Sequence, residues 1–172
     1  KKVESHRDSF VYSGAPWDLT VALDLRRQQV KQLVEPGQIN LKHSHGGIVT
    51  LEYAIQYLQV MHGHRHPSLR TPNTLRALAA LIDVGLIPRA TGENLRQSYL
   101  FIRMPIDALR MVRGNTKDLV IPPSDSDEFI FLARRVGYQT EDWQAGARHL
   151  QTDIEEHMKQ NRQFFEKTFG KV

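Results

Sequence analysis

Apolar residues recur every three or four positions along most of the chain, which is the spacing of amphipathic α-helices. The first such stretch predicts a helix over residues 18–34. Pro16 suits its beginning, where a missing N–H costs nothing, and Glu35-Pro36-Gly37 ends it. The expected inward stripe is Val21, Leu25, Val30, Leu33 and Val34, and the expected solvent-facing run is Arg26, Arg27, Gln28 and Gln29.

The same spacing predicts two further helices in the middle of the chain. One covers residues 50–62 and ends at Gly63, with an inward stripe of Leu51, Ala54, Ile55 and Leu58. The other covers residues 74–84, has Asn73 or Thr71 as its N-cap, and ends at Gly85. Its expected inward residues are Leu75, Leu78, Ala79 and Ile82.

Three helices are predicted in the C-terminal half. Residues 91–112 form one, with a kink or break at Pro105 because proline removes a backbone donor. The next begins at Ser124 or Asp125 and ends at Gly137, with Phe129, Leu132, Ala133 and Val136 facing inward. The last is capped by Thr140, carries Glu141 and Asp142 in its first turn, and reaches Phe169.

Extended conformation is predicted only for two short segments, Ile39–Leu41 and Leu119–Ile121. The pattern therefore predicts an all-α fold. We expect one bundle of about six helices, kinked near Pro105, in a single domain that spans residues 1–172.

Composition places the chain among globular proteins, with 40% hydrophobic and 24% charged residues. No apolar run is long enough to cross a membrane, and from the polar start we expect no signal peptide. Because the start also lacks an initiator Met, we expect a fragment of a longer protein. The absence of cysteine excludes disulfides and favours a cytoplasmic location. A net charge of +4 suits a phosphate-bearing or acidic partner, whereas nucleic acid is not indicated.

Candidate chemistry gathers in residues 40–53, NLKHSHGGIVTLEY. Lys42 suits a phosphate oxygen, and the N–H groups of Gly46 and Gly47 can approach a ligand closely before a helix whose dipole favours anions. The alternative is a tight turn whose glycines serve packing alone. Glu52 could hold Lys42, an arginine or a metal, or could be a solvated carboxylate. The spacing leaves these alternatives open.

This stretch resembles a motif of the glutamine synthetase adenylyltransferases, the bacterial enzymes that attach AMP to glutamine synthetase and remove it. A related version occurs in the uridylyltransferase that acts on the signal protein PII. The matching positions are Asn40, Lys42, Gly46, Gly47, Ile48, Glu52 and Tyr53. Further similar segments are Ser9–Tyr12, Gln56–Gln59, His62–Leu75 and Ser98–Arg103. Thr50 departs from the pattern, since the family usually carries an acidic residue there.

The resemblance implies a helical domain that follows a nucleotidyltransferase core. In this family the core carries a Gly-Ser turn and an Asp-x-Asp pair, which holds the Mg ions that act on ATP. Asp125-Ser126-Asp127 reads instead as a helix cap. We therefore expect no catalytic or metal-binding residue here, but nucleotide binding assisted by Lys42, Gly46, Gly47 and Glu52. The implied partners are the missing nucleotidyltransferase domain, glutamine synthetase and the PII signal protein.

Three other groups of residues raise alternatives. A Zn or Ni site would use Glu52 together with the histidines His43, His45, His62, His64 and His66; exposed histidines are the simpler interpretation. A basic surface would gather Arg65, Arg70, Arg103, Arg110, Arg113 and Lys117. Core anchors are expected at Trp17, Trp143, Phe164, Phe165 and Phe169. Thr50 favours the alternative function, a regulatory or protein-interaction module without catalytic duty.

Overall fold

The computed structural model describes residues 2–15, 17–114 and 119–170, so Pro16 and Lys117 lie outside the described residues. Within them the fold is all-α, as predicted, with seven α-helices and one short 3-10 helix. Their bounds are α1 (Lys2–Val11), α2 (Leu19–Leu33), α3 (Ile48–His62), η1 (Pro67–Leu69), α4 (Thr74–Asp83), α5 (Arg89–Arg113), α6 (Asp127–Arg135) and α7 (Trp143–Phe169). The hydrophobic pattern missed α1.

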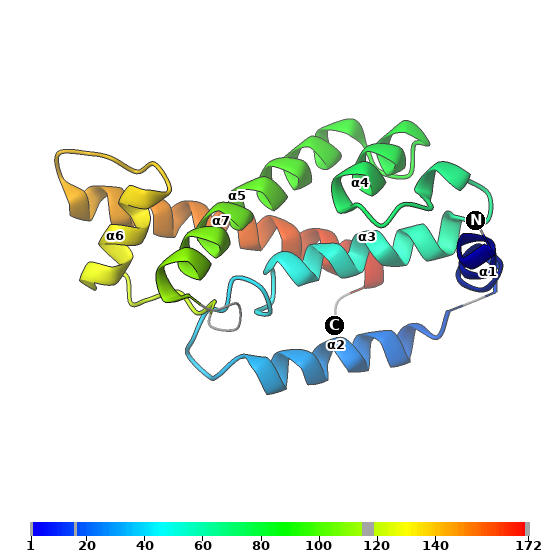
Figure 1. Cartoon of the computed structure of the whole chain (residues 1–172), viewed down its shortest axis with the longest axis horizontal. Coiled ribbons are helices and arrows are strands. Elements are labelled where there is room, and N and C mark those ends of the chain that lie inside the picture. Colours follow the sequence, from blue (N-terminus) through cyan, green and yellow to red (C-terminus); the bar gives the residue numbers. More distant parts are fainter. Residues whose placement is uncertain (1, 16, 115–118, 171–172) are drawn as a thin grey trace.

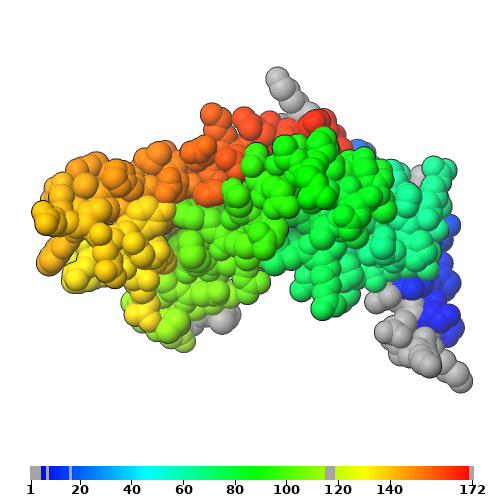
Figure 2. All heavy atoms as spheres, turned by 90° about the horizontal axis from the view of Figure 1, so that it is seen from above, coloured from blue at the N-terminus to red at the C-terminus, as the bar shows by residue number. Residues whose placement is uncertain are grey.

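The long C-terminal helix α7 organises the bundle, because α3, α5 and α6 all pack against it. The helix α4 packs against both α3 and α5. The helix α2 runs apart from the other helices (Figure 1). Seen from above, the body is elongated, with α6 and the start of α7 at one end and α1 at the other (Figure 2). The core contains Leu51 and Ile55 of α3, Ile102 of α5, and Leu150 and Ile154 of α7.

Helix α5 continues through Pro105 to Arg113, so a break at this position is excluded. Pro105 is buried within the helix. A kink there stays a prediction. Proline removes one backbone hydrogen bond, and burial of the surrounding helix face compensates that loss.

The two predicted extended segments pair with each other. Asn40 and Val120 form an isolated antiparallel bridge. The amide of Leu41 donates to the carbonyl of Leu119 (3.0 Å), and that of Ile121 donates to the carbonyl of Ile39 (2.8 Å). The bridge therefore ties the loop before α3 to the segment that leads into α6.

Helix caps follow the expected chemistry, at positions that differ in two cases. Asn73 caps α4, as predicted, by accepting a bond from the amide of Arg76. The cap of α6 is Ser126 rather than Ser124 or Asp125, which confirms the capping interpretation of the Asp-Ser-Asp segment. The cap of α7 is Asp142 rather than Thr140, because its carboxylate accepts from two first-turn amides.

The predicted inward face of α2 was wrong. Val21, Leu25 and Leu33 are exposed, whereas Ala22 and Arg26 are buried. The buried α4 residues likewise include Ala77 and Ala80 rather than Ala79. Both errors arise because the position of neighbouring helices, not the apolar pattern alone, decides which face is covered.

The tryptophans are not core anchors as predicted. Trp17 and Trp143 are both about half exposed, and the guanidinium of Arg134 lies 4.5 Å from the centroid of the Trp143 ring. Phe164 and Phe165 are buried as predicted. Phe169 is only partly buried and packs its ring against that of Phe165.

Candidate functional site

The loop over residues 40–47 is held by its own polar side chains. The side-chain carbonyl of Asn40 accepts bonds from the amides of Lys42 and His43, both at 3.0 Å. The hydroxyl of Ser44 accepts from the amide of Asn40 at 2.8 Å. These bonds give the loop one defined shape before α3 begins, and they place Lys42 near the first turns of that helix.

Gly46 lies against the backbone of α7. Its φ is +88°, and a Cβ atom there would overlap the carbonyl oxygen of Met158. Its own carbonyl accepts a bond from the side-chain amide of Asn161 (3.0 Å), whose oxygen accepts from the hydroxyl of Ser98 (2.8 Å). A buried polar chain thus joins the loop, α7 and α5, and glycine is required for both conformation and close approach.

The amides of the glycine pair are already used within the chain. Gly46 donates to the hydroxyl of Thr50 (3.0 Å) and Gly47 to the carbonyl of Ser44 (2.9 Å). The next amides, of Ile48 and Val49, donate to carbonyls of the same loop. A ligand could reach these N–H groups only by displacing those bonds. Packing therefore accounts for the presence of both glycines. A direct contact with a nucleotide is then expected from the side chains of Lys42 and Glu52.

Those two side chains belong to a cluster that we call the Lys42–Arg103 face: Lys42, Glu52, Tyr99 and Arg103. The hydroxyl of Tyr99 donates to the carboxylate of Glu52 (3.3 Å) and accepts from the guanidinium of Arg103 (3.4 Å). Among the described residues, the amine of Lys42 has no hydrogen bond or ion pair. The face combines two cationic groups with one half-buried carboxyl group.

The electrostatics of the face follow from partial burial. Burial raises the pKa of the Glu52 carboxyl, while the Tyr99 hydrogen bond and the charges of Lys42 and Arg103 oppose that rise. The hydrogen bond to Tyr99 raises the pKa of Arg103, which stays charged. Two cations can contact phosphate oxygens, and the carboxyl can bond a hydroxyl. A single carboxyl beside two cations does not fit Mg²⁺, which prefers several oxygen ligands.

The sequence reasoning missed Arg26, which joins this site from α2. Its Nη2 donates to the carbonyls of His43 (2.9 Å) and Ser44 (3.3 Å) and to the hydroxyl of Thr50 (2.9 Å). The one available signal was Ala22, a small residue one helical turn earlier that allows close approach. Thr50, where the family usually carries an acid, is therefore part of a buried arginine contact.

The other candidate groups do not converge. Among the described residues, no three His, Cys, Asp or Glu side chains lie close enough together to hold a metal ion. Three arginines of the predicted basic surface form ion pairs with separate carboxylates. Arg70 lies 3.7 Å from Asp8, Arg110 lies 3.1 Å from Asp107, and Arg113 lies 2.7 Å from Glu128. Of that set, only Arg103 belongs to the Lys42–Arg103 face.

Comparison with known proteins agrees with the family resemblance of the sequence motifs. A family model described as GlnD PII-uridylyltransferase matches residues 21–169. The chain belongs to this family. In the part of the chain that the structure describes, no helix is long and apolar enough to cross a membrane.

Curated relatives in this family share one name, bifunctional glutamine synthetase adenylyltransferase/adenylyl-removing enzyme. That of Corynebacterium glutamicum is 31% identical over 151 residues, which is 87% of this chain and 14% of the relative. That of Corynebacterium efficiens is 32% identical over 92% of this chain and 14% of the relative. That of Mycobacterium tuberculosis is 36% identical over 68% of this chain and 12% of the relative. The predicted family resemblance is confirmed, and the chain spans about one eighth of the length of these relatives.

Proposed function

We propose that this chain is the helical domain of a nucleotidyltransferase that adenylylates and deadenylylates glutamine synthetase in bacterial nitrogen regulation. The names of the relatives and the family match support this function. The chemistry belongs to a separate nucleotidyltransferase domain, which binds Mg²⁺ and ATP in the cytoplasm. The chain alone is expected to be inactive, since Asp125-Ser126-Asp127 serves as a helix cap.

The proposed duty of the chain is to assist nucleotide binding through the Lys42–Arg103 face. One observation carries this proposal: the hydrogen bond from Tyr99 to Glu52 joins two segments, 40–53 and 98–103, that separately resemble the family. Lys42 and Arg103 would contact the phosphates of ATP, and Glu52 a hydroxyl of the nucleotide. Gly46 and Gly47 would act indirectly by fixing the loop that carries Lys42 against α7. Mg²⁺ would be held by carboxylates of the other domain.

Replacement of Lys42 by Ala in the full-length enzyme tests this duty. Loss of one charge-assisted hydrogen bond is expected to raise the KM for Mg-ATP about tenfold or more, with little change in expression or Tm. Lys42→Arg should restore part of the affinity. Lys167→Ala, at an exposed position near the end of α7, is the matched control. Unchanged ATP kinetics in Lys42→Ala would overturn the proposed contact.

A second candidate function is a regulatory or interaction module, in which this domain binds glutamine synthetase or the PII signal protein. The observation that favours it is the set of exposed apolar side chains near the N-terminus, Phe10, Trp17, Val21 and Leu25. The parent reading frame discriminates the two functions. A Gly-Ser turn with an Asp-x-Asp pair before Lys1 supports the enzyme domain, and its absence supports the module.

A further inference from the structure

Arg26 is a buried cation whose hydrogen-bond partners are all uncharged. Its side chain is 3% exposed, and its partners are Gln29, Thr50 and the carbonyls of His43 and Ser44. No carboxylate among the described residues forms an ion pair with it. Burial lowers the pKa of Arg26, as expected for a charge removed from water. Buried charges in proteins are normally balanced, so this position lacks a negative partner.

A cavity of about 250 Å³ lies beside Arg26, between α2, the start of α3 and α7. It is lined by Leu23, Arg26, Arg27, His45, Thr50, Arg162, Phe165 and Glu166. The lining therefore contains three arginines and one glutamate. Among the described residues, Arg162 makes no hydrogen bond or ion pair, whereas Arg27 pairs with Asp24 at the surface. His45 lines the same cavity as Arg26 and Arg162.

We propose that this cavity binds a phosphate group, which supplies the negative charge that Arg26 lacks. The planar fork of arginine matches phosphate geometry, and the partly buried setting strengthens the attraction relative to open solvent. The hydroxyl of Thr50 accepts from Arg26 and donates to the carbonyl of Ser44, so it positions the guanidinium beside the cavity. A volume of about 250 Å³ lies below the range of about 300–1,000 Å³ for sites that enclose drug-sized ligands. The cavity therefore takes the phosphate itself.

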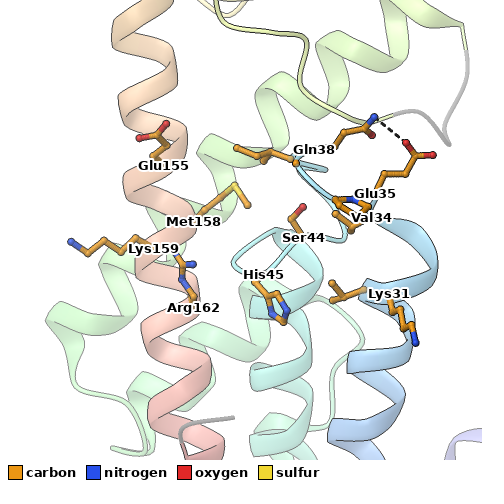
Figure 3. A pocket seen from close by; sticks show the side chains of 14 residues that line it. Lys31, Val34, Glu35, Gln38, Ser44, His45, Glu155, Met158, Lys159 and Arg162 are labelled. Atoms are coloured by element: carbon orange, nitrogen blue, oxygen red, sulfur yellow. Dashed lines mark hydrogen bonds between the residues drawn. The ribbon is translucent and has the colours of Figure 1, made fainter.

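A larger groove of about 770 Å³ adjoins the cavity and shares His45 and Arg162 with it. Figure 3 shows Lys159 and Arg162 on α7, His45 in the loop before α3, and Lys31 on α2. Val34 and Met158 add apolar surface to the same groove. The phosphate can thus come from two sources: a free inorganic ion, or a nucleotide whose remaining atoms lie in the groove.

This phosphate site is separate from the Lys42–Arg103 face. Thr50 faces Arg26, whereas Glu52 faces Tyr99. Residues two positions apart on an α-helix point to nearly opposite sides. The two sites therefore flank α3, and substitutions in one need not affect ligand binding at the other.

The test is titration of this chain with inorganic phosphate at constant ionic strength, followed by calorimetry and by the Tm. We expect saturable binding and a rise in Tm, since a ligand that binds only the folded state stabilises it. Arg162→Gln should weaken phosphate binding about tenfold or more. Arg65→Gln, an exposed arginine outside the site, is the control and should bind as the wild type does.

The variant Thr50→Asp provides an independent test of the phosphate site, because it places a carboxylate beside Arg26. This variant should be more stable than the wild type without phosphate and should lose the response to phosphate. Thr50→Val, which lacks a hydroxyl but adds no charge, should keep a weaker response. A wild-type chain that shows no saturable binding, or an Arg162→Gln chain that binds as tightly as the wild type, would overturn the proposal.

Titration with ADP separates the two sources of phosphate. If the site takes a nucleotide, Lys159→Gln should weaken ADP binding and leave inorganic phosphate unaffected, since Lys159 lines only the larger groove. If it takes the free ion, ADP should bind no more tightly than phosphate, and Lys159→Gln should have no effect. ADP binding that Lys42→Ala abolishes, without any phosphate response, would support the Lys42–Arg103 face and overturn the second site.

Discussion

Helices α2 and α3 are both 15 residues long and carry apolar side chains at helical spacing, yet they are buried very differently. Seven residues of α3 are buried, on more than one side of the helix, whereas α2 buries only Ala22 and Arg26. The helix α3 lies among α4, α5 and α7, whereas no helix within the described residues makes an extensive contact with α2. The comparison shows that an apolar stripe becomes core only where neighbouring elements are held against it.

The two helices are also attached differently. The start of α3 is locked to α7 by the contact between Gly46 and Met158 and by the Asn161 hydrogen bond. In α2 the side chain of Arg26 hydrogen-bonds to the loop before α3, and Leu23 packs against the core while only partly buried. Because α3 is held mainly by packing and α2 by the hydrogen bonds of Arg26, we expect the two helices to respond differently to substitution.

The largest expected difference is between two glycines beside these helices. Gly46→Ala should destabilise the chain by about 4 kcal/mol or more, because its Cβ would overlap the backbone of α7. Gly37→Ala, just after α2, has a similar φ of +80° but nothing nearby, so it should cost only about 1 kcal/mol. Urea unfolding measures both. Equal costs would show that backbone conformation, not the contact with α7, makes Gly46 necessary.

Next in size is a pair of leucines, one on each helix. Leu51 of α3 is 0% exposed, so Leu51→Ala should cost about 3 kcal/mol through the cavity that it leaves. Leu25 of α2 is 55% exposed, and Leu25→Ala should change the free energy of unfolding by about 0.5 kcal/mol or less. The same unfolding measurement applies. A large cost at Leu25 would mean that α2 is covered in solution.

Arg26→Met tests the attachment of α2 and should cost about 2 kcal/mol, since it removes the guanidinium donor of the His43 carbonyl and of the Thr50 hydroxyl. Hydrogen exchange should then become faster along residues 19–33 and remain unchanged along α3. Arg27→Met, which loses only an exposed ion pair, is the matched control. Unaltered protection of α2 in Arg26→Met would show that other contacts hold this helix.

The smallest expected effect concerns pH and Glu52 of α3. Burial raises the pKa of Glu52 in the folded chain, so the folded state retains a proton that the unfolded chain has already released. Stability from this group therefore falls as pH rises from the ordinary value near 4.5 through the raised value. Glu52→Gln should remove this dependence. Urea unfolding of both chains between pH 4 and pH 7 measures it, and parallel curves would contradict a raised pKa.

Much of the fold could be predicted from local signals. The positions of every α-helix except α1, the cap at Asn73 and the two extended segments followed from spacing and turn chemistry, because these depend on residues close in sequence. The pairing of the extended segments did not, since it joins Asn40 to Val120. The hydrogen bond between Tyr99 and Glu52 could not, since it joins residues 47 positions apart. The resemblance named both segments separately, and only the packing of α5 beside α3 brought them together.

The sequence by itself determined where this chain forms helices, which family it belongs to, and that residues 40–53 form a special turn. It could not determine whether that turn serves a ligand or the fold. A ligand role for the side chains of Lys42 and Glu52 stays a proposal. The tertiary structure decided that helix α7 lies against Gly46 and that the amides of the turn donate within the chain. It also decided that Arg26 is buried rather than solvated. Both outcomes depend on contacts between segments that are distant in sequence. The local pattern of residues does not specify which distant segment packs against a given position.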